Sequence, residues 1–276
     1  MIKSESAVAD THCHLDLSAF DADLTEVLDR AKAEGVKYIL VPGIDLASSQ
    51  KAVSIAEHYP DVYAAVGVHP HRSASWNASV ASELRSLTES SSVCAIGEIG
   101  LDYYRNLAPP DVQREAFQDQ LALAADLGLP VVVHSRQALE EVLDDLLAWS
   151  ADLPPGLTQR AGVLHAYSGD LQAASRASAQ GFYFGVAGPV TYRNADERRR
   201  VTSQLPRERI LLETDAPYLT PHPFRRKRNE PAFVRLVAKE VSRLFGMKES
   251  ILAGITSRNA ANLFGWNHAN NSGNIL

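Results

Sequence analysis

Histidines and carboxylates recur in this sequence at one place in a repeating pattern, directly after short apolar runs. His12 and His14 end the first run, and because side chains on a strand alternate between its faces, both imidazoles point to the same side. Imidazole and carboxylate groups are the usual protein ligands of Zn and related divalent metals. Six side chains share this position: His12, His14, Glu98, His134, His165 and Asp215. The pattern predicts a metal site.

A single histidine at the end of a strand is more often a hydrogen-bonded core residue than a ligand. Repetition favours the metal, because each buried imidazole or carboxylate needs a partner and a cation satisfies several at once. Six donors exceed the four of a tetrahedral site, so we expect two divalent cations about 3.5–4 Å apart. The expected division is His12, His14, Glu98 and Asp215 for one cation, and Glu98, His134 and His165 for the other.

This donor set indicates hydrolysis by an activated water, with a phosphodiester as the expected target. Glu98 is expected to bridge the cations and Asp215 to be both ligand and proton acceptor. Zn, Mn, Mg and Fe all suit such donors. Glu213 precedes Asp215 by two residues and is expected to hydrogen-bond a ligating histidine, although a buried ion pair would explain it equally well.

Further polar residues near these donors are expected to contact the substrate. His69 ends another apolar run and is assigned to a substrate phosphate; the alternative is a loop histidine packed under Pro70. Loop residues after Glu98 and His134 can bind phosphate or stack on a base. They are Asp102, Tyr103, Arg105 and Arg136.

The elements that must position these residues alternate along the chain. Short Val-, Ile- and Ala-rich runs end near His14, Pro42, His69, Glu98, His134, His165, Gly185 and Asp215. Amphipathic stretches separate them, at 23–34, 47–58, 80–88, 111–127, 139–149, 171–180 and 196–204, followed by 231–245 and 248–264. About eight βα units predict an α/β fold, a single-domain (β/α)8 TIM barrel over residues 1–265. The tail at 266–276 is expected to be disordered.

Composition limits the classes of function. A net charge of −6 and a pI near 5.8 exclude a protein that coats nucleic acid through a broad basic surface. The one concentrated basic run is Arg225–Arg228. Two cysteines, the absence of a signal-peptide pattern and the absence of an apolar run of ~20 residues predict a cytoplasmic protein without membrane contact. We expect a monomer.

The motifs closely resemble those of the TatD family of metal-dependent deoxyribonucleases, within the amidohydrolase-like barrels. They cover almost the whole chain: DTHCHLD at 10–16, GVHP at 67–70, GEIGLDYY at 97–104, PVVVHSR at 130–136, HAYSG at 165–169, ETDAPYL at 213–219 and KRNEP at 227–231. The resemblance implies a dinuclear site on the six donors and hydrolysis of DNA, often from the 3′ end. Ala166-Tyr167 replaces the family's usual Cys-Phe, and Arg226 replaces a Gly, which affects the pocket edge and not the donors.

Three functions follow as hypotheses. The first is a 3′-5′ exonuclease that admits single-stranded or frayed DNA ends, because a barrel mouth cannot receive an intact duplex. The second is a metal-dependent esterase or deacylase, such as a D-aminoacyl-tRNA deacylase, or a small-molecule amidohydrolase. The third is a non-catalytic metal-binding protein, which an open barrel mouth disfavours because structural metal sites are closed by protein ligands.

Overall fold

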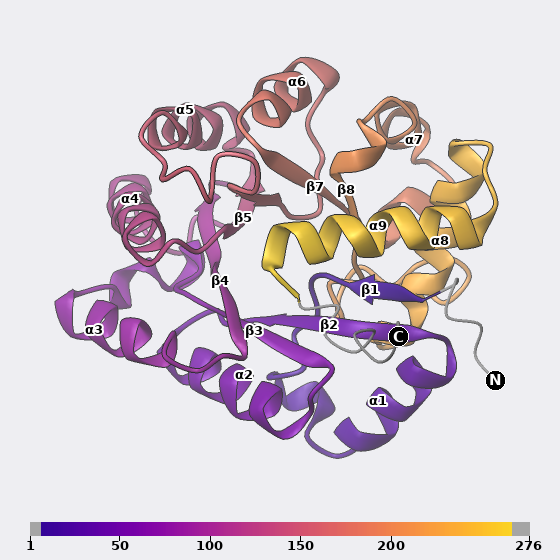
Figure 1. Ribbon diagram of the computed structural model, residues 1–276, viewed down its shortest axis with the longest axis horizontal. Coiled ribbons are helices and arrows are strands. Elements are labelled where there is room, and N and C mark those ends of the chain that lie inside the picture. Colours follow the sequence, from indigo (N-terminus) through magenta and orange to yellow (C-terminus); the bar gives the residue numbers. More distant parts are fainter. Residues whose placement is uncertain (1–6, 267–276) are drawn as a thin grey trace, which may run out of the picture.

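Eight parallel strands form a barrel in the computed structural model, which describes residues 7–266 (Figure 1). The strands pair in sequence order and are β1 (Val8–Asp10), β2 (Val36–Pro42), β3 (Val62–Val66), β4 (Val93–Asp102), β5 (Val131–Arg136), β6 (Gly162–Leu164), β7 (Phe182–Val186) and β8 (Ile210–Leu212). The segment after β1 closes the barrel against β8: Thr11 N donates to Leu212 O at 3.0 Å and Asp215 N donates to His12 O at 2.8 Å. The expected TIM barrel is confirmed.

The helices surround the strands, as expected for βα units (Figure 1). They are α1 (Leu24–Ala33), α2 (Leu46–His58), α3 (Ala78–Leu87), α4 (Pro110–Leu127), α5 (Leu139–Ser150), α6 (Leu171–Ala179), α7 (Asp196–Thr202), α8 (Val234–Leu244) and α9 (Glu249–Phe264). Differences from the expected ranges have local causes. Helix α3 begins earlier than expected because the Asn77 side chain accepts from the amides of Ser79 and Val80. Helix α4 ends at Leu127, as expected, where Gly128 adopts a left-handed φ of 66°.

The amino-terminal end of the barrel is filled by apolar side chains. Leu40, Val132 and Leu211 pack inside it with Leu263 of α9, and α9 lies across this end of the strands (Figure 1). Trp266 is 2% exposed and its ring stacks on Tyr63 with centroids 5.1 Å apart. The packed structure thus includes the first residue of the expected tail; residues 267–276 lie outside the described part.

Between residues 7 and 266, none of the helices combines the length and the apolar character needed to cross a bilayer.

Candidate metal centre

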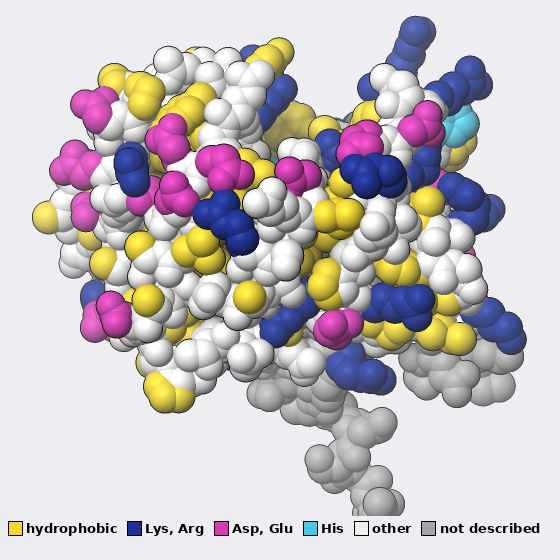
Figure 2. All heavy atoms as spheres, turned by 90° about the horizontal axis from the view of Figure 1, so that it is seen from above, with side chains coloured by type: hydrophobic (Ala, Val, Ile, Leu, Met, Phe, Trp, Pro, Cys, Tyr) yellow, Lys and Arg dark blue, Asp and Glu magenta, His cyan; other side chains and the backbone are white. Residues whose placement is uncertain are grey.

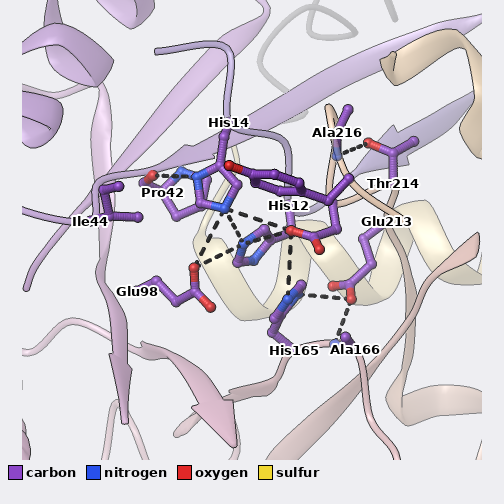
Figure 3. A network of polar contacts seen from close by, with 12 residues as sticks. His12, His14, Pro42, Ile44, Glu98, His165, Ala166, Glu213, Thr214 and Ala216 are labelled. Atoms are coloured by element: carbon purple, nitrogen blue, oxygen red, sulfur yellow. Dashed lines mark hydrogen bonds and ion pairs between the residues drawn. The ribbon is translucent and has the colours of Figure 1, made fainter. Parts of the chain in front are cut away.

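The six expected donors meet at the carboxyl-terminal end of the barrel, although five different segments supply them. His12 and His14 follow β1, Glu98 lies in β4 and His134 in β5. The other two donors are His165, directly after β6, and Asp215, three residues after β8. Figure 3 shows the imidazoles of His12, His14 and His165 and the carboxylate of Glu98 converging on one another. The strand ends therefore bring together residues that are up to 203 positions apart in the sequence.

Four of these donors face a common point. His12 Nε2 lies 3.2 Å from His14 Nε2, and Glu98 Oε2 lies 3.3 and 3.5 Å from these two nitrogens. Asp215 Oδ1 lies 3.8 Å from the first nitrogen and 3.6 Å from the second. Pro42 O lies 3.2 Å from His14 Nδ1 and fixes the ring so that Nε2 points into the pocket.

These separations test whether a cation fits. Donors bound tetrahedrally about 2.0–2.1 Å from one ion lie about 3.4 Å from each other. The five distances among His12, His14, Glu98 and Asp215 are 3.2–3.8 Å. Two imidazole nitrogens pointing at each other across 3.2 Å cannot both be satisfied as acceptors, so a shared positive ion suits them. The residues present fit a divalent metal.

Glu98 presents its second oxygen to a different pair of histidines. Its Oε1 lies 2.9 Å from His134 Nδ1 and 3.7 Å from His69 Nε2. The carboxylate is 2% exposed and is therefore held between two groups of imidazoles, one at each oxygen. The two oxygens of Glu98 thus face separate groups of nitrogen donors.

A local irregularity in β4 orients Glu98. The register between β4 and β5 advances from Ile96–Val131 to Ile99–Val133, so β4 has one extra residue there. Such a bulge turns the affected side chains relative to the strand. The strand thereby places the Glu98 side chain inside the mouth of the barrel.

Among the expected donors, His165 lies beside His12 and Asp215, and its ring centroid is 6.4 Å from that of His134. Its ring stacks on His12 with centroids 3.6 Å apart, and its Nε2 lies 3.8 Å from Asp215 Oδ1. Within residues 7–266, the sets of three donors with mutual distances within 4.8 Å are His12-His165-Asp215, His12-His14-Glu98 and His69-Glu98-His134. His69, which is expected at a substrate phosphate, thus lies beside Glu98 and His134.

Glu213 contacts the Nδ1 atom of His165. Its Oε1 lies 2.9 Å from His165 Nδ1 and accepts from the backbone amide of Ala166 at 2.6 Å (Figure 3). Gly185 in β7 makes room for this carboxylate, because a Cβ at that position would collide with Glu213 Oε2. The supporting contact expected of Glu213 is therefore present.

The charges in the pocket are strongly coupled. Burial raises the pKa of Glu98, but the charges of His12 and His69 outweigh it and leave this pKa well below its usual value. Burial lowers the pKa of His165, but the carboxylates of Glu213, Asp215 and Glu98 outweigh it and raise the pKa to about 10. The carboxylates thus demand positive charge in the pocket, which protonated imidazoles or bound cations can supply.

His71 and Asp10 are two further candidate residues that were not predicted from the sequence. His71 Nε2 lies 2.8 Å from Asp102 Oδ2, and the same oxygen lies 3.1 Å from His134 Nε2. The second histidine of the His-Pro-His sequence at 69–71 was the available signal. Asp10 is fully buried and accepts from Thr214 N at 2.8 Å and Thr214 Oγ1 at 2.6 Å, which joins β1 to the segment after β8.

The residues expected to contact substrate differ in their burial and in their partners. Asp102 is fully buried and occupied by the two histidines. Tyr103 donates its hydroxyl to Glu141 Oε2 at 2.8 Å, and the Arg105 amide donates to Asp102 Oδ1. Arg136 is exposed, with its guanidinium 3.9 Å from the Tyr104 ring centroid. Arg136 is the last residue of β5, so its exposed side chain lies at the carboxyl-terminal end of the barrel.

Comparison with known proteins agrees with this geometry. The family model described as TatD related DNase matches residues 9–265. The uncharacterized metal-dependent hydrolase YabD of Bacillus subtilis (strain 168) is 40% identical over 255 residues, which cover 92% of this chain and 98% of YabD. The 3′-5′ ssDNA/RNA exonuclease TatD of Cronobacter sakazakii is 39% identical over 260 residues, which cover 92% of this chain and 97% of that protein.

Solved structures give the same result. The crystal structure of YJJV, a TatD homolog from Escherichia coli K12, superposes with a TM-score of 0.87 at 33% identity. The match covers 95% of this chain and 99% of YJJV. Full-length similarity in sequence and fold thus accompanies the clustered donors. The chain belongs to the TatD-related DNase family and is a metal-dependent hydrolase.

Proposed function

We propose that this protein hydrolyses phosphodiester bonds of DNA as a 3′-5′ exonuclease, using water activated at a site for two divalent cations. The observation that carries the proposal is the Glu98 carboxylate, whose two oxygens face separate groups of imidazoles. The printed name of the Cronobacter relative supports the polarity and the nucleic-acid substrate.

The proposed ligands are the six expected donors, with Glu98 shared. When bound, divalent cations in such a pair lower the pKa of water and neutralise negative charge on phosphate oxygens. Asp215 is proposed to accept the proton of the attacking water, because its carboxylate borders the pocket and is less buried than that of Glu98. His165 is oriented for metal binding by Glu213 at 2.9 Å, and His134 by Asp102 at 3.1 Å.

Substrate binding is assigned to the rim of the pocket. We propose that His69 contacts the phosphate beside Glu98, and that Arg136 contacts a neighbouring phosphate or base. Asp102 and Tyr103 act more indirectly, since their polar atoms hold His71, His134 and Glu141. A barrel mouth that leads to a buried centre favours a single strand or frayed end as the substrate, acted on by a monomer.

The function is tested by restoring metals to chelator-treated protein. Mn, Mg, Zn and Fe are added separately, with 3′-labelled single-stranded DNA, duplex DNA, RNA and a D-aminoacyl-tRNA as substrates. We expect at least one metal to restore trimming of single-stranded DNA from the 3′ end. Deacylation without trimming would establish an esterase instead, and inactivity with every metal would contradict catalysis. Shortening of the DNA with retention of the 3′ label would contradict the proposed polarity.

A further inference from the structure

Two arginines in the segments that follow β7 and β8 have no carboxylate partner among residues 7–266. Arg198, on α7, donates from Nη1 to the backbone oxygen of Tyr167 at 2.8 Å. Arg225, in the loop after β8, holds its guanidinium 3.9 Å from the ring centroid of Tyr192. Within the described residues 7–266, neither guanidinium has an Asp or Glu oxygen within ion-pair distance, 4.0 Å.

Their neighbours behave differently. Arg199 pairs with Asp196, Arg200 pairs with Glu197, and Arg228 pairs with Asp23 at 2.7 Å. The last member of the basic run at 225–228 thus serves the fold, whereas Arg225 points its charge at an aromatic ring. Several Lys and Arg side chains project at the upper right in Figure 2, on the side of the molecule where α7 lies.

Arg198 is the more informative of the two, because it is only partly exposed. Burial lowers the pKa of its guanidinium. A partly buried charge with one carbonyl acceptor leaves most of its five donors without a described acceptor. An anion that enters the pocket would supply the missing partner.

Both arginines contact tyrosines in the loops that follow β6 and β7, at the carboxyl-terminal end of the barrel. Tyr167, which accepts from Arg198, follows the donor His165 by two residues and is buried. Tyr192 is influenced by both arginines and by a donor. Burial and the charge of Asp215 raise the pKa of its hydroxyl, whereas Arg225 and Arg198 lower it. The Tyr192 hydroxyl is therefore within electrostatic reach of both guanidinium groups and of Asp215, and Arg225 contacts its ring directly.

We propose that Arg198, Tyr192 and Arg225 bind a second phosphate of the substrate strand, adjacent to the phosphate that is hydrolysed. The guanidinium groups match phosphate oxygens through charge-assisted hydrogen bonds, and the tyrosine hydroxyl adds a neutral donor. This site rests on the proposed function and extends it: the preferred substrate is a strand with at least two phosphates, and a diester with one phosphate lacks the contacts to the second phosphate.

The test compares Arg198→Met with Arg200→Met. Both changes remove one positive charge from α7, but Arg200 is exposed and already paired with Glu197. Binding of a fluorescein-labelled, phosphorothioate-linked oligothymidylate to the purified protein is measured by anisotropy at several salt concentrations. Hydrolysis of an unmodified oligonucleotide is compared with hydrolysis of bis(4-nitrophenyl) phosphate, which has one phosphate.

We expect Arg198→Met to weaken oligonucleotide binding and raise the KM for the oligonucleotide about 10-fold or more, as for a lost hydrogen bond to a charged group. The slope of log affinity against log salt should shrink by about 0.7, one contact to a single strand. The increase in KM should be larger than for bis(4-nitrophenyl) phosphate. Arg198→Lys, which keeps the charge, should recover part of the binding, and Arg200→Met should match the unaltered protein.

Equal effects of the Arg198 and Arg200 changes, or equal losses on both substrates, would overturn the proposed site. A melting temperature measured for each variant separates loss of folding from loss of binding. If the unaltered protein binds the oligonucleotide through Arg198 but hydrolyses neither substrate, the phosphate site stands and the proposed function fails. If it trims DNA and Arg198→Met binds normally, the function stands and the phosphate site fails.

Discussion

The two ends of the barrel use the same eight strands for opposite purposes. At the amino-terminal end, Leu40, Val132 and Leu211 are buried against α9, and the interior is apolar. At the carboxyl-terminal end, the continuations of the strands bury His12 and Glu98, which are 0% and 2% exposed. A buried apolar group stabilises a fold by leaving water, whereas a buried charged group needs a partner. Stability and chemistry are thus separated along one axis.

Substitutions at the two ends should therefore affect different properties of the protein. A change at the carboxyl-terminal end should reduce activity or metal binding while the barrel remains folded. A change at the amino-terminal end should reduce the free energy of unfolding while the folded fraction keeps its activity. Four substitutions test this separation, beginning with the largest expected effect.

Glu98→Ala should have the largest effect, because it removes an oxygen from each of the two proposed cation sites. We expect kcat/KM for the oligonucleotide to fall about 10³-fold or more. Bound metal, measured by mass spectrometry, should fall with it, while circular dichroism stays that of the folded barrel. Retention of full activity by this variant would contradict the assignment of the centre.

Leu211→Ala, at the amino-terminal end, should reduce stability and leave activity nearly unchanged. Leu211 is 0% exposed and packs inside the barrel, so its truncation leaves a cavity and should lower the free energy of unfolding by about 2–5 kcal/mol. Denaturant titration measures this loss. The kcat of the folded protein should stay within about twofold; a much larger decrease would show that the two ends are not independent.

Glu213→Gln tests the support of a proposed ligand. The amide keeps the shape of the side chain and can still accept from Ala166 N, but it loses the charge that orients His165. We expect metal affinity to fall about 10–100-fold, measured by titration of chelator-treated protein. Glu208→Gln, an exposed change at the opposite end of the barrel, is the control and should leave metal affinity unchanged.

His69→Gln should have the smallest effect of the four. If its imidazole contacts the substrate phosphate, the KM should rise about 10-fold while both metal equivalents remain bound. His58→Gln, an exposed change on α2, provides the matched control. Loss of one metal equivalent from His69→Gln alone would instead make His69 a ligand, which its 3.7 Å distance to Glu98 Oε1 allows.

Much of this separation was predictable from the sequence. The alternation of apolar runs and amphipathic stretches indicated the barrel, and the common position of the donors after those runs indicated one pocket. These inferences depend on local periodicity, which the chain carries in its own order. His12 and His14 could be placed on one face because the period of a strand is two.

Which donors are neighbours in space could not be predicted from the sequence. Which imidazole lies beside which depends on the stagger of the strands and on the bulge at Glu98, and neither is written in the spacing of residues. His165 therefore lies beside His12, with ring centroids 3.6 Å apart, and His69 lies beside His134, with ring centroids 4.5 Å apart. The link between His71 and Asp102 spans 31 residues and depends on the same three-dimensional stagger.

Glu98 is proposed to bridge two cations, and anomalous diffraction from crystals soaked in Mn²⁺ tests this bridge most directly. We predict two anomalous peaks, one beside each oxygen of the Glu98 carboxylate, with His12 and His14 at the first and His134 at the second. A single peak at full Mn²⁺ occupancy, or two peaks that leave Glu98 uncoordinated, would contradict the account.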